Sequence, residues 1–434
     1  MITLVDLDIM NVLTAEKPIA VAEKKSPVAC CRFCNAPLTR TFVDLGMSPL
    51  CESFVPPAKQ NAAEVFYPLH VYLCDQCKLV QLEEYVSPSD IFTEYAYFSS
   101  FSDSAVKHAK KYVEMIIPSV ALNQDSFVVE IASNDGYLLQ HFLPHGIPVT
   151  GIEPAQNVAA VAREKGIPAV CEFLGPVVAQ RFRDKYGPAN LVIGNNVLAH
   201  VPDINGFVEG LRLLLADDGV LTMEFPHLLR LIEGNQFDTI YHEHFSYLSL
   251  LAVETIFAAH GLTVFDVEEL EIHGGSLRVY ASPTTSQLKA RANLSKIRED
   301  EAAAGFYHEA AYLDFSKRVM ETKNNILKTL VELKSQGKSI VGYGAPGKGN
   351  TLLNYCGIRT DFLDYTVDRN DYKHGQFCPG SRIPIFPIEK IRETKPDYVF
   401  ILPWNLTREI TQQCEYIREW GGKFIIPIPE VKII

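Results

Sequence analysis

Several features typical of membrane, secreted and nucleic-acid-binding proteins are missing from this sequence. No apolar run reaches the roughly 18 residues of a membrane-spanning helix, and the N-terminus lacks the basic and apolar regions of a secretory signal. The net charge of −12 argues against a general affinity for nucleic acid or anionic membranes. Low-complexity tracts and short repeats are also missing. We therefore expect a cytoplasmic protein that binds neither membranes nor nucleic acid.

The length and the order of local patterns predict three domains. A chain of 434 residues is too long for one ordinary core. Cysteines mark the first part, which we place at residues 1–88 with an N-terminal tail. Residues 89–285 alternate short apolar runs with helix-like segments, and residues 286–434 begin with a long helical stretch before a second alternation. The prediction is an α/β protein whose two larger domains resemble dinucleotide-binding folds.

The first alternation predicts a parallel sheet wound with helices. Its strands are "SFVVEIA", "PVTGIEP", "NLVIGNN" and "GVLTMEF", each short, apolar and followed by polar or small residues. The last two strands, "GLTVFDVEEL" and "GSLRVYAS", are separated by only a short connection, so we expect them to be neighbours. Such a final pair is a mark of the class I methyltransferase sheet.

Four of the ten cysteines form two CxxC pairs. A CxxC turn directs two thiolates at one ion, and two such turns complete the tetrahedral shell that zinc prefers. Because no position stays open, the predicted site is structural. The alternatives are reduced free thiols, or a ligand set in which Cys30 or Cys51 replaces a member of a pair. The predicted zinc ligands are Cys31, Cys34, Cys74 and Cys77.

The segment "VVEIASNDGYLL" predicts a cofactor site at the end of the first strand of the middle domain. Ligands of doubly wound sheets lie outside the carboxyl ends of the strands, where small residues let a cofactor approach the backbone. Glu153 ends the next strand, at the place of an acid that accepts hydrogen bonds from a ribose. The other predicted cofactor contacts are Glu130, Ala132, Asn134, Gly136, Asn195 and Asn196.

The charges at this turn favour one cofactor. A pyrophosphate prefers a glycine-rich turn without nearby acids. Glu130 and Asp135 crowd the turn here, which suits the cationic sulfonium of S-adenosylmethionine (SAM). An α/β domain without this cofactor is the alternative.

A second glycine-rich loop, "VGYGAPGKGN", predicts a diphosphate cradle in the C-terminal domain. Its GxGxxG pattern, with Asp368 about 20 residues further on, also allows a nicotinamide site. A P-loop is excluded because Gly349 stands where the magnesium-binding hydroxyl would be. Lys373 and Arg382 follow as loop contacts or as a solvated basic loop. The predicted cradle residues are Gly344, Pro346, Gly347 and Lys348.

The stretch "DTIYHEHFSY" gathers a phenol, two imidazoles and a carboxylate. The pattern HEH is not HExxH, which places two imidazoles one helical turn apart on zinc. His242 and His244 share a face in an extended segment, so a two-histidine metal site stays open, although no third ligand is evident. The remaining alternatives are an acid/base apparatus and a polar structural loop.

Several motifs together resemble the nucleotide-sugar C-methyltransferases, which build branched deoxysugars. The resemblance runs along nearly the whole chain and implies three domains, a structural zinc ion, SAM in the middle domain, and a sugar nucleotide between the middle and C-terminal domains. It is carried by "CRFC", "LCDQCKLVQL", "YAYFSSFSDSA", "EIASNDGYLL", "GIEP", "NNVLAHVPD", "FDTIYHEHFSY", "HGGSLRVY" and "GYGAPGKGNTLLNYCGI".

The resemblance also assigns roles to the ionisable groups of "DTIYHEHFSY". Carbon methylation needs a carbanion, which a 4-keto sugar provides as an enolate once a neighbouring proton leaves. His244 is the expected base, Glu243 orients it or contacts the sugar, and Tyr241 contacts the substrate or steadies the oxyanion. Tyr95 and Tyr97 are the next candidates for the substrate pocket.

The sequence thus predicts a SAM-dependent C-methyltransferase that acts on a nucleotide-linked 4-keto-deoxyhexose. By the resemblance alone, C3 is favoured over C5. The alternatives are an NAD-dependent oxidoreductase that uses the second glycine-rich loop, an O- or N-methyltransferase, and a zinc-stabilised binding module without turnover. We expect a monomer or a weak homo-oligomer.

Overall fold

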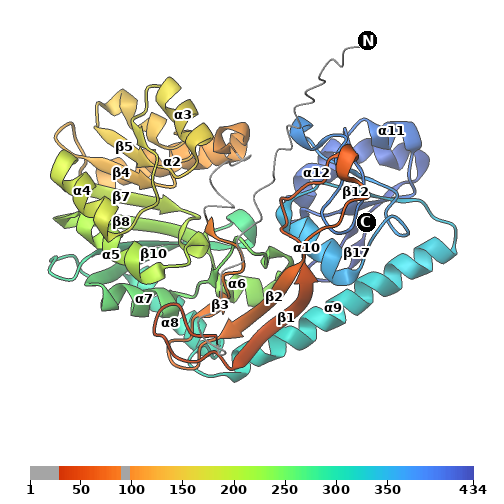
Figure 1. Ribbon diagram of the computed structural model, residues 1–434, viewed down its shortest axis with the longest axis horizontal. Helices are drawn as coiled ribbons and strands as arrows, with labels where there is room; N and C mark the ends of the chain where they lie inside the picture. The colour runs from red at the N-terminus through yellow and green to blue at the C-terminus, as the bar shows by residue number, and fades with distance from the viewer. Residues whose placement is uncertain (1–28, 89–97) are drawn as a thin grey trace, which may run out of the picture.

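Three β-sheets organise the part of the chain that the structure describes. The computed structural model describes residues 29–88 and 98–434. Figure 1 shows the largest sheet on one side, the sheet of the C-terminal residues on the other, and the strands β1 to β3 at the base between them. Within the described ranges, no helix is long and apolar enough to cross a membrane.

The N-terminal sheet takes its last strand from the middle of the chain. Its order is β1-β2-β3-β9, and each neighbouring pair is antiparallel. The strand β9 begins two residues after His244, so the predicted catalytic stretch is continuous with this sheet. The strands are β1 (Arg40–Ser48), β2 (Tyr67–Leu73), β3 (Val80–Leu82) and β9 (Ser246–Tyr247).

The seven-stranded sheet has the order β10-β11-β8-β7-β4-β5-β6. The strands from β8 to β6 in this order are parallel, whereas β11 is antiparallel to both β8 and β10. The predicted pairing of the last two strands is confirmed, and the sheet is that of a class I methyltransferase. Its strands are β4 (Val128–Ile131), β5 (Val149–Ile152), β6 (Ala169–Val170), β7 (Ala189–Asn195), β8 (Leu215–Pro226), β10 (Leu262–Leu270) and β11 (Ser276–Pro283).

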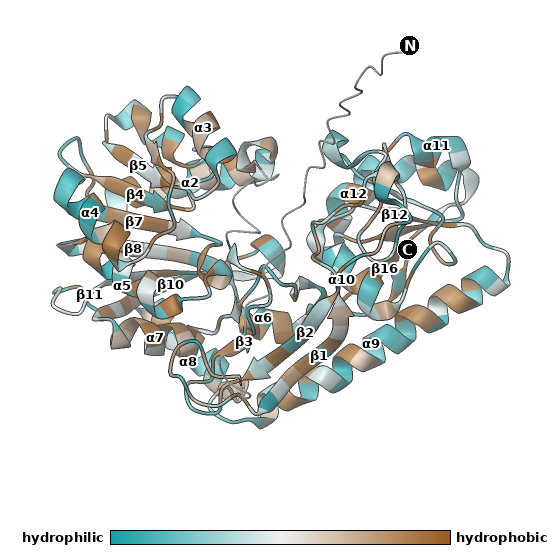
Figure 2. Ribbon diagram, in the orientation of Figure 1, coloured by the Kyte–Doolittle hydropathy of each residue, from teal (hydrophilic) through white to brown (hydrophobic). Residues whose placement is uncertain are grey.

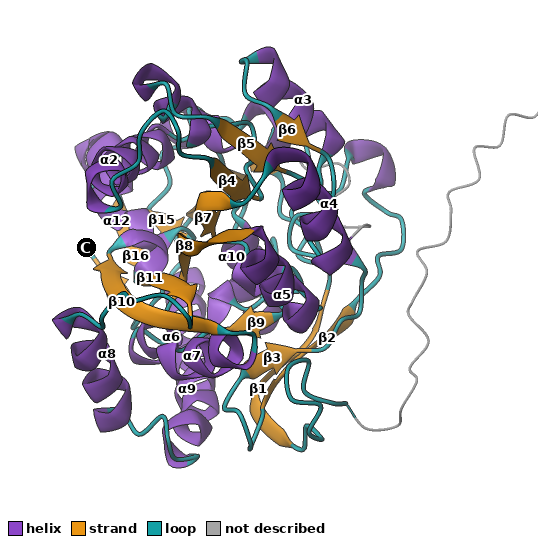
Figure 3. Cartoon of the chain, turned by 90° about the vertical axis from the view of Figure 1, so that its left-hand side faces the viewer, coloured by secondary structure: helices purple, strands orange, loops and turns teal. Residues whose placement is uncertain are grey.

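Helices cover both faces of this sheet. Figure 3 shows α2 on one side of the strands and α4 and α5 on the other. Polar caps begin several of them: the Ser102 hydroxyl accepts from the Ala105 N–H before α2, and the Ser249 hydroxyl accepts from Ala252 before α7. The helices are α2 (Asp103–Ser119), α3 (Gln156–Glu164), α4 (Pro176–Tyr186), α5 (Ile204–Leu214), α6 (Leu228–Glu233) and α7 (Leu250–Ala259).

Two helices follow in the stretch after residue 286, where the sequence predicts long helical structure. They are α8 (Ala292–Ala303) and the long α9 (Ala310–Ser335). Apolar and polar residues alternate along α9 in Figure 2, and its apolar face is buried. The Phe315 ring stacks on Phe42 of β1 with 4.8 Å between centroids. Because each such buried side chain contributes about 1.5–3 kcal/mol, this face ties the N-terminal sheet to α9.

The C-terminal domain is a second α/β unit. Its sheet has the order β14-β13-β12-β15-β16-β17 and is parallel except for β17 at one edge. The strands are β12 (Ile340–Tyr343), β13 (Thr366–Val367), β14 (Ile385–Phe386), β15 (Tyr398–Ile401), β16 (Lys423–Ile426) and β17 (Lys432–Ile433). The helices are α10 (Gly347–Cys356), α11 (Lys390–Thr394) and α12 (Thr407–Gln413).

Candidate active site

The turn after β4 has an unusual backbone. Ala132 and Asn134 have φ values of 54° and 50°, and Asn196, which follows β7, has a φ of 54°. Residues other than glycine rarely adopt this left-handed conformation, and those that do cluster at functional sites. Gly136 has a φ of +78°, and a Cβ atom there would lie 2.3 Å from Ile167 Cδ1. The turn therefore requires glycine at this position.

Glu153 braces the same turn from the end of β5. Its two carboxylate oxygens accept hydrogen bonds from the backbone N–H groups of Asn134 and Ala155, both at 2.9 Å. Burial raises the pKa of Glu153 above its ordinary value, and the two N–H groups oppose the shift. The acid predicted to bind the ribose is thus held at the carboxyl edge of the sheet, beside the turn.

Buried acceptors without a hydrogen-bond partner gather at this edge. Such groups are rare in folded proteins, and each one needs a partner from outside the chain, such as a ligand, an ion or a water molecule. Burial, Glu153 and Asp135 raise the pKa of Glu130 well above its ordinary value, so a cationic ligand would be favourable there. Among the described residues, the acceptors without a partner include Glu130 Oε2, Ser133 Oγ, Asp135 Oδ1, Asn195 Oδ1 and Asn196 Oδ1.

Asp135 contributes less negative charge than its position in the sequence suggests. Its Oδ2 atom lies 2.8 Å from the Lys165 ammonium and also accepts a hydrogen bond from the Ser100 hydroxyl. The charge of Asp135 is therefore balanced within the protein, whereas Glu130 and Glu153 are the carboxyl groups at this edge whose charged forms a cationic ligand would favour. These groups suit SAM. Its ribose hydroxyls can donate hydrogen bonds to the acceptors, and its sulfonium is a cation that the acids attract.

The predicted base, His244, is held in one tautomer. Its Nδ1 atom lies 2.9 Å from the Thr239 carbonyl oxygen, which can only accept, so Nδ1 carries the proton and Nε2 has a free lone pair. Burial, followed by the charge of His200, lowers the pKa of His244 well below its ordinary value. The imidazole is therefore neutral near pH 7, as a general base must be.

Two aromatic rings enclose His244. The Tyr241 ring lies 4.0 Å from it, and the His200 ring lies 4.7 Å away in an edge-on arrangement. His200 ends the 3₁₀ helix η5 (Leu198–His200), just after Asn195 and Asn196 of the cofactor edge. Burial lowers the pKa of His200 to about 4. Sequence reasoning missed this residue, although it lies in the quoted motif "NNVLAHVPD".

Glu243 is a buried carboxyl group next to the base. Its side chain is buried, and burial together with the charge of Glu52 raises its pKa to about 7. Cys51 Sγ lies 3.8 Å from Glu243 Oε1. The group is thus poised to change protonation state near neutral pH, and the N-terminal domain contributes to its environment.

His242 faces away from this group. Its Nε2 atom lies 3.2 Å from the Pro68 carbonyl oxygen of β2, and its ring packs against Tyr67 and Tyr85 at 5.8 and 6.4 Å. Burial lowers its pKa to about 4. The two histidines of the HEH sequence therefore have different surroundings, which argues against their sharing one metal ion.

The glycine-rich loop of the C-terminal domain follows β12. Gly344 has a φ of +86°, and Pro346 precedes the first turn of α10. Asp368 Oδ2 accepts from the Ala345 N–H at 2.7 Å, and Lys373 Nζ donates to the Ala345 carbonyl at 2.9 Å. Both predicted ligand contacts thus also hold the loop in its conformation.

Lys348 faces the catalytic stretch. Its ammonium lies 2.9 Å from Asn405 Oδ1 and 4.8 Å from the centroid of the Trp404 ring. Trp404 in turn donates from Nε1 to the buried Asp238, three residues before Tyr241, at 2.7 Å. Lys348 also lowers the pKa of His244. The C-terminal domain therefore places a cation near the base.

The remaining predicted substrate residues differ in their positions. Arg382 donates to the Ala62 carbonyl at 3.0 Å and pairs with Glu64 at 3.2 Å, so it connects the C-terminal and N-terminal domains. Tyr95 and Tyr97 lie outside the described residues.

A buried charge network at the end of β8 was also missed by sequence reasoning. Arg278 Nη2 lies 2.8 Å from Glu224 Oε2, and His108 Nε2 of α2 lies 3.0 Å from the same atom. Glu224 pairs in register with Asn195 of β7. The network therefore borders the cofactor edge, opposite the side that Glu153 occupies.

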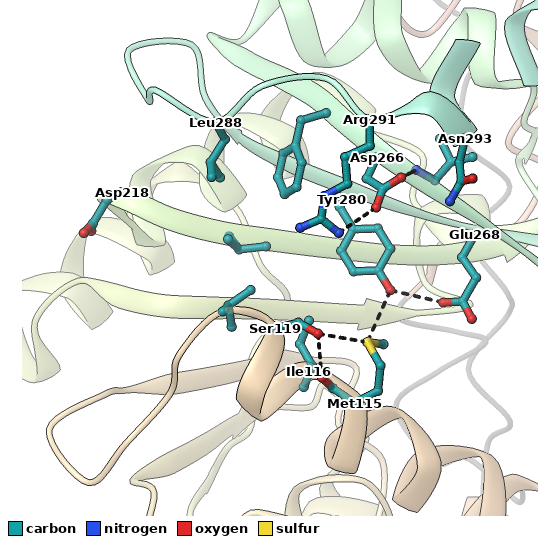
Figure 4. Close-up of a pocket in the computed structure, with 14 residues that line it drawn as sticks. Met115, Ile116, Ser119, Asp218, Asp266, Glu268, Tyr280, Leu288, Arg291 and Asn293 are labelled. Atoms are coloured by element: carbon teal, nitrogen blue, oxygen red, sulfur yellow. Dashed lines mark hydrogen bonds and ion pairs between the residues drawn. The ribbon is translucent and has the colours of Figure 1, made fainter. Parts of the chain in front are cut away.

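A cavity of about 410 Å³ lies elsewhere on the methyltransferase sheet. Figure 4 shows the Tyr280 hydroxyl in it, 3.1 Å from Glu268 Oε2, with Met115 on the α2 side. Arg291 pairs with Asp266 at 3.0 Å on the opposite wall. Of the predicted site residues that the structure describes, none lines this cavity.

The four cysteines of the two CxxC pairs meet in space. Their sulfur atoms all lie within 4.8 Å of one another, and Cys31–Cys77 and Cys34–Cys74 are separated by 3.5 Å. Tetrahedral zinc with Zn–S bonds of about 2.3 Å needs sulfur separations slightly below 4 Å. Gln81 Nε2 donates to Cys31 Sγ at 3.1 Å, a contact that favours the thiolate. The cluster fits zinc.

Fold and sites together define a SAM-dependent methyltransferase with a zinc-binding module. Three family models match consecutive parts of the chain: a zinc binding domain at residues 31–92, a methyltransferase domain at 106–267 and a C-methyltransferase C-terminal domain at 271–429. The C-methyltransferase NovU of Streptomyces niveus is 35% identical over 408 residues, which cover 94% of this chain and 97% of NovU. The chain belongs to this family of C-methyltransferases, which excludes the oxidoreductase alternative.

Solved methyltransferase structures are also similar to part of the chain. A SAM-dependent methyltransferase from Clostridium acetobutylicum is 12% identical and covers 41% of this chain and 92% of its own, with a TM-score of 0.34. Magnesium protoporphyrin IX methyltransferase from Synechocystis PCC 6803, solved with SAM, is 16% identical and covers 41% and 81%, with a TM-score of 0.31. These TM-scores are below 0.5, and no conclusion rests on them.

Proposed function

We propose that this enzyme methylates C3 of a nucleotide-linked 4-keto-deoxyhexose. One observation supports the substrate class: the glycine-rich loop of the C-terminal domain is fastened to the catalytic stretch. The Thr351 hydroxyl of α10 donates to the Ile240 carbonyl at 3.0 Å, and Lys348 acts electrostatically on His244. A substrate with an acidic C–H bond at one end and a diphosphate at the other would match these two adjacent sites. The choice of C3 rests on the family resemblance.

The residues around His244 can supply the proton transfer. A 4-keto sugar has an acidic proton on C3 because the C–H electron pair can move into an enolate. Nε2 of His244 takes this proton, and the Tyr241 hydroxyl donates to the enolate oxygen. Glu243 contacts the sugar or orients the base. When bound, SAM supplies the electrophilic methyl group that forms the new bond to C3 and leaves its sulfur as a neutral thioether.

The C-terminal domain would hold the rest of the substrate. Gly344, Pro346 and Gly347 form the proposed backbone cradle for the diphosphate, with Lys348 and Lys373 as cations beside it. Asp368 would contribute to substrate binding mainly by holding the glycine-rich loop in place. Arg382 would contribute by connecting the C-terminal domain to the N-terminal domain. Tyr95 and Tyr97 stay predictions for the sugar pocket.

The substrate class is tested by isotope exchange. The enzyme is incubated in heavy water with thymidine-, guanosine- and cytidine-diphospho-4-keto-deoxysugars, with and without SAM. We expect deuterium at C3 of one of them, and a methylated product that forms only with SAM, both followed by mass spectrometry and NMR. Exchange at C5 instead would contradict the regiochemistry. No exchange and no product with any of the three sugars would contradict the substrate class.

The cofactor site is tested by Glu153→Gln. We expect SAM affinity to fall about 10- to 100-fold, because a hydrogen bond to a charged group is worth about 1.5–3 kcal/mol. Calorimetry measures the change, and the melting temperature shows whether the turn after β4 survives. Glu164→Gln is the control, since this glutamate ends α3 in the same β–α unit. Equal SAM affinity of Glu153→Gln and the native enzyme would remove Glu153 from the cofactor site.

A further inference from the structure

The loop after β1 reaches from the N-terminal domain to the first turn of α10. Asn350 Nδ2 donates to the Cys51 carbonyl at 2.7 Å. A Cβ atom on Gly347 would lie 2.9 Å from Cys51 Sγ and 3.1 Å from Glu52 Oε1. The glycine that begins α10 therefore makes room for this loop.

Glu52 occupies surroundings that suit a phosphate group. Desolvation raises the pKa of Glu52 above its ordinary value and Asp368 adds to the shift, while the Lys373 ammonium and the Gly347 N–H oppose it. Lys373 Nζ lies 3.6 Å from Glu52 Oε2. A backbone N–H at the start of a helix and a lysine are the usual partners of a bound phosphate. The Glu52 side chain is 42% exposed, so an incoming ligand can reach it.

We propose that Glu52 competes with the diphosphate for the nucleotide-sugar site and so sets the affinity of this site for phosphate ligands. In the ligand-free protein its carboxylate holds the place of a phosphate at Gly347 and Lys373, and it leaves when a diphosphate binds. The idea rests on the proposed function, which puts the diphosphate in this cradle.

Competition between the two anions explains how Glu52 sets the affinity for phosphate ligands. A carboxylate and a phosphate repel each other and cannot share the same donors, so the ligand must displace the side chain. If Glu52 holds the cradle nine-tenths of the time, the apparent affinity of every phosphate ligand falls about tenfold. An uncharged nucleoside has no phosphate that competes with Glu52, so its affinity does not depend on this side chain.

The test compares Glu52→Gln with the native enzyme. The probes are thymidine, guanosine and cytidine diphosphates and the matching uncharged nucleosides, with affinities measured by calorimetry at low ionic strength. We expect Glu52→Gln to bind the preferred nucleoside diphosphate about tenfold more tightly and the nucleoside with unchanged affinity. Glu52→Ala should change affinity in the same direction, which guards against a local effect of the amide.

Glu84→Gln is the matched control. Glu84 is an exposed glutamate of the N-terminal domain that follows β3, and Arg32 is the cation that acts on it. It carries the same side chain as Glu52 but interacts with Arg32 and not with Lys373, so its loss should leave nucleoside diphosphate affinity unchanged. Unchanged or weaker binding by Glu52→Gln would overturn the proposal while leaving the substrate class intact. If no nucleoside diphosphate binds the native enzyme or any variant, the proposed function fails, and this inference fails with it.

Discussion

His244→Asn is expected to lose deuterium exchange at C3 and methyl transfer by about 10²- to 10⁴-fold, the usual contribution of a general base. SAM affinity should not change, because the cofactor edge is built from other strands. The asparagine amide can replace Nδ1 as the donor to the Thr239 carbonyl, which His244 contacts at 2.9 Å. What the variant lacks is a basic nitrogen at the position of Nε2. The expected defect is therefore chemical and not structural.

His242→Asn is the control for this prediction. His242 is an imidazole in the same stretch, but it faces the Pro68 carbonyl of the N-terminal sheet. Its replacement should lower the melting temperature slightly and leave exchange at C3 close to that of the native enzyme. Rapid exchange by His244→Asn would exclude His244 as the base. Loss of exchange in a stably folded His242→Asn variant would move the role to the neighbouring imidazole.

The zinc site and the acids of the cofactor edge could be predicted from the sequence. The geometry of the first is local, and that of the second follows from the sheet topology. Cys31 and Cys34 lie within one turn, so their sulfurs must point to a common place, and the second CxxC pair repeats this. Glu130 and Glu153 end neighbouring parallel strands, whose carboxyl ends meet at one edge of the sheet. Neither inference needs the packing between domains.

The contacts that complete the catalytic site could not be predicted in this way. His200 meets His244 through packing between distant segments, which leaves no periodicity in the sequence. Cys51 and Glu52 reach the site from the N-terminal domain, in a loop without a recognisable motif.

The strand β9 and the contacts within the glycine-rich loop could not be predicted from the sequence for related reasons. With only two residues, β9 shows no alternating pattern, yet it joins the predicted middle domain to the N-terminal sheet. Asp368 and Lys373 were recognised as polar residues near a glycine-rich loop, but their hydrogen bonds to Ala345 within that loop could not be foreseen. A charged residue near such a loop can hold the loop, the ligand or both.

The zinc site supports the catalytic stretch as well as the N-terminal module, through two connections. The strand β3 follows Cys77 and pairs with β9, where Val80 lies opposite Tyr247. Cys51 Sγ approaches Glu243 Oε1 to 3.8 Å from the same domain. Both connections end within a few residues of His244. The position of the base should therefore depend on a folded zinc module.

Cys74→Ser is expected to release zinc and to lower turnover and C3 exchange at least about 100-fold. Structural zinc contributes on the order of 10 kcal/mol to the folding free energy of small zinc modules. Without zinc, the module is therefore expected to lose its folded structure. SAM binding should persist, because the cofactor edge lies on β4, β5 and β7 of a separate sheet. Zinc content is measured by atomic emission, SAM affinity by calorimetry and exchange by NMR.

Cys30→Ser supplies the matched control, since Cys30 is exposed, precedes Cys31 directly and is not part of the four-cysteine cluster. It should retain zinc, turnover and exchange. A zinc-free Cys74→Ser enzyme with native turnover would show that the module does not position the catalytic stretch. Loss of SAM binding in the same proportion as exchange would contradict the separation of the two sites, because it would mean that the cofactor edge also needs the zinc module. Retained SAM binding with lost exchange is the result that the pairing of β3 with β9 requires.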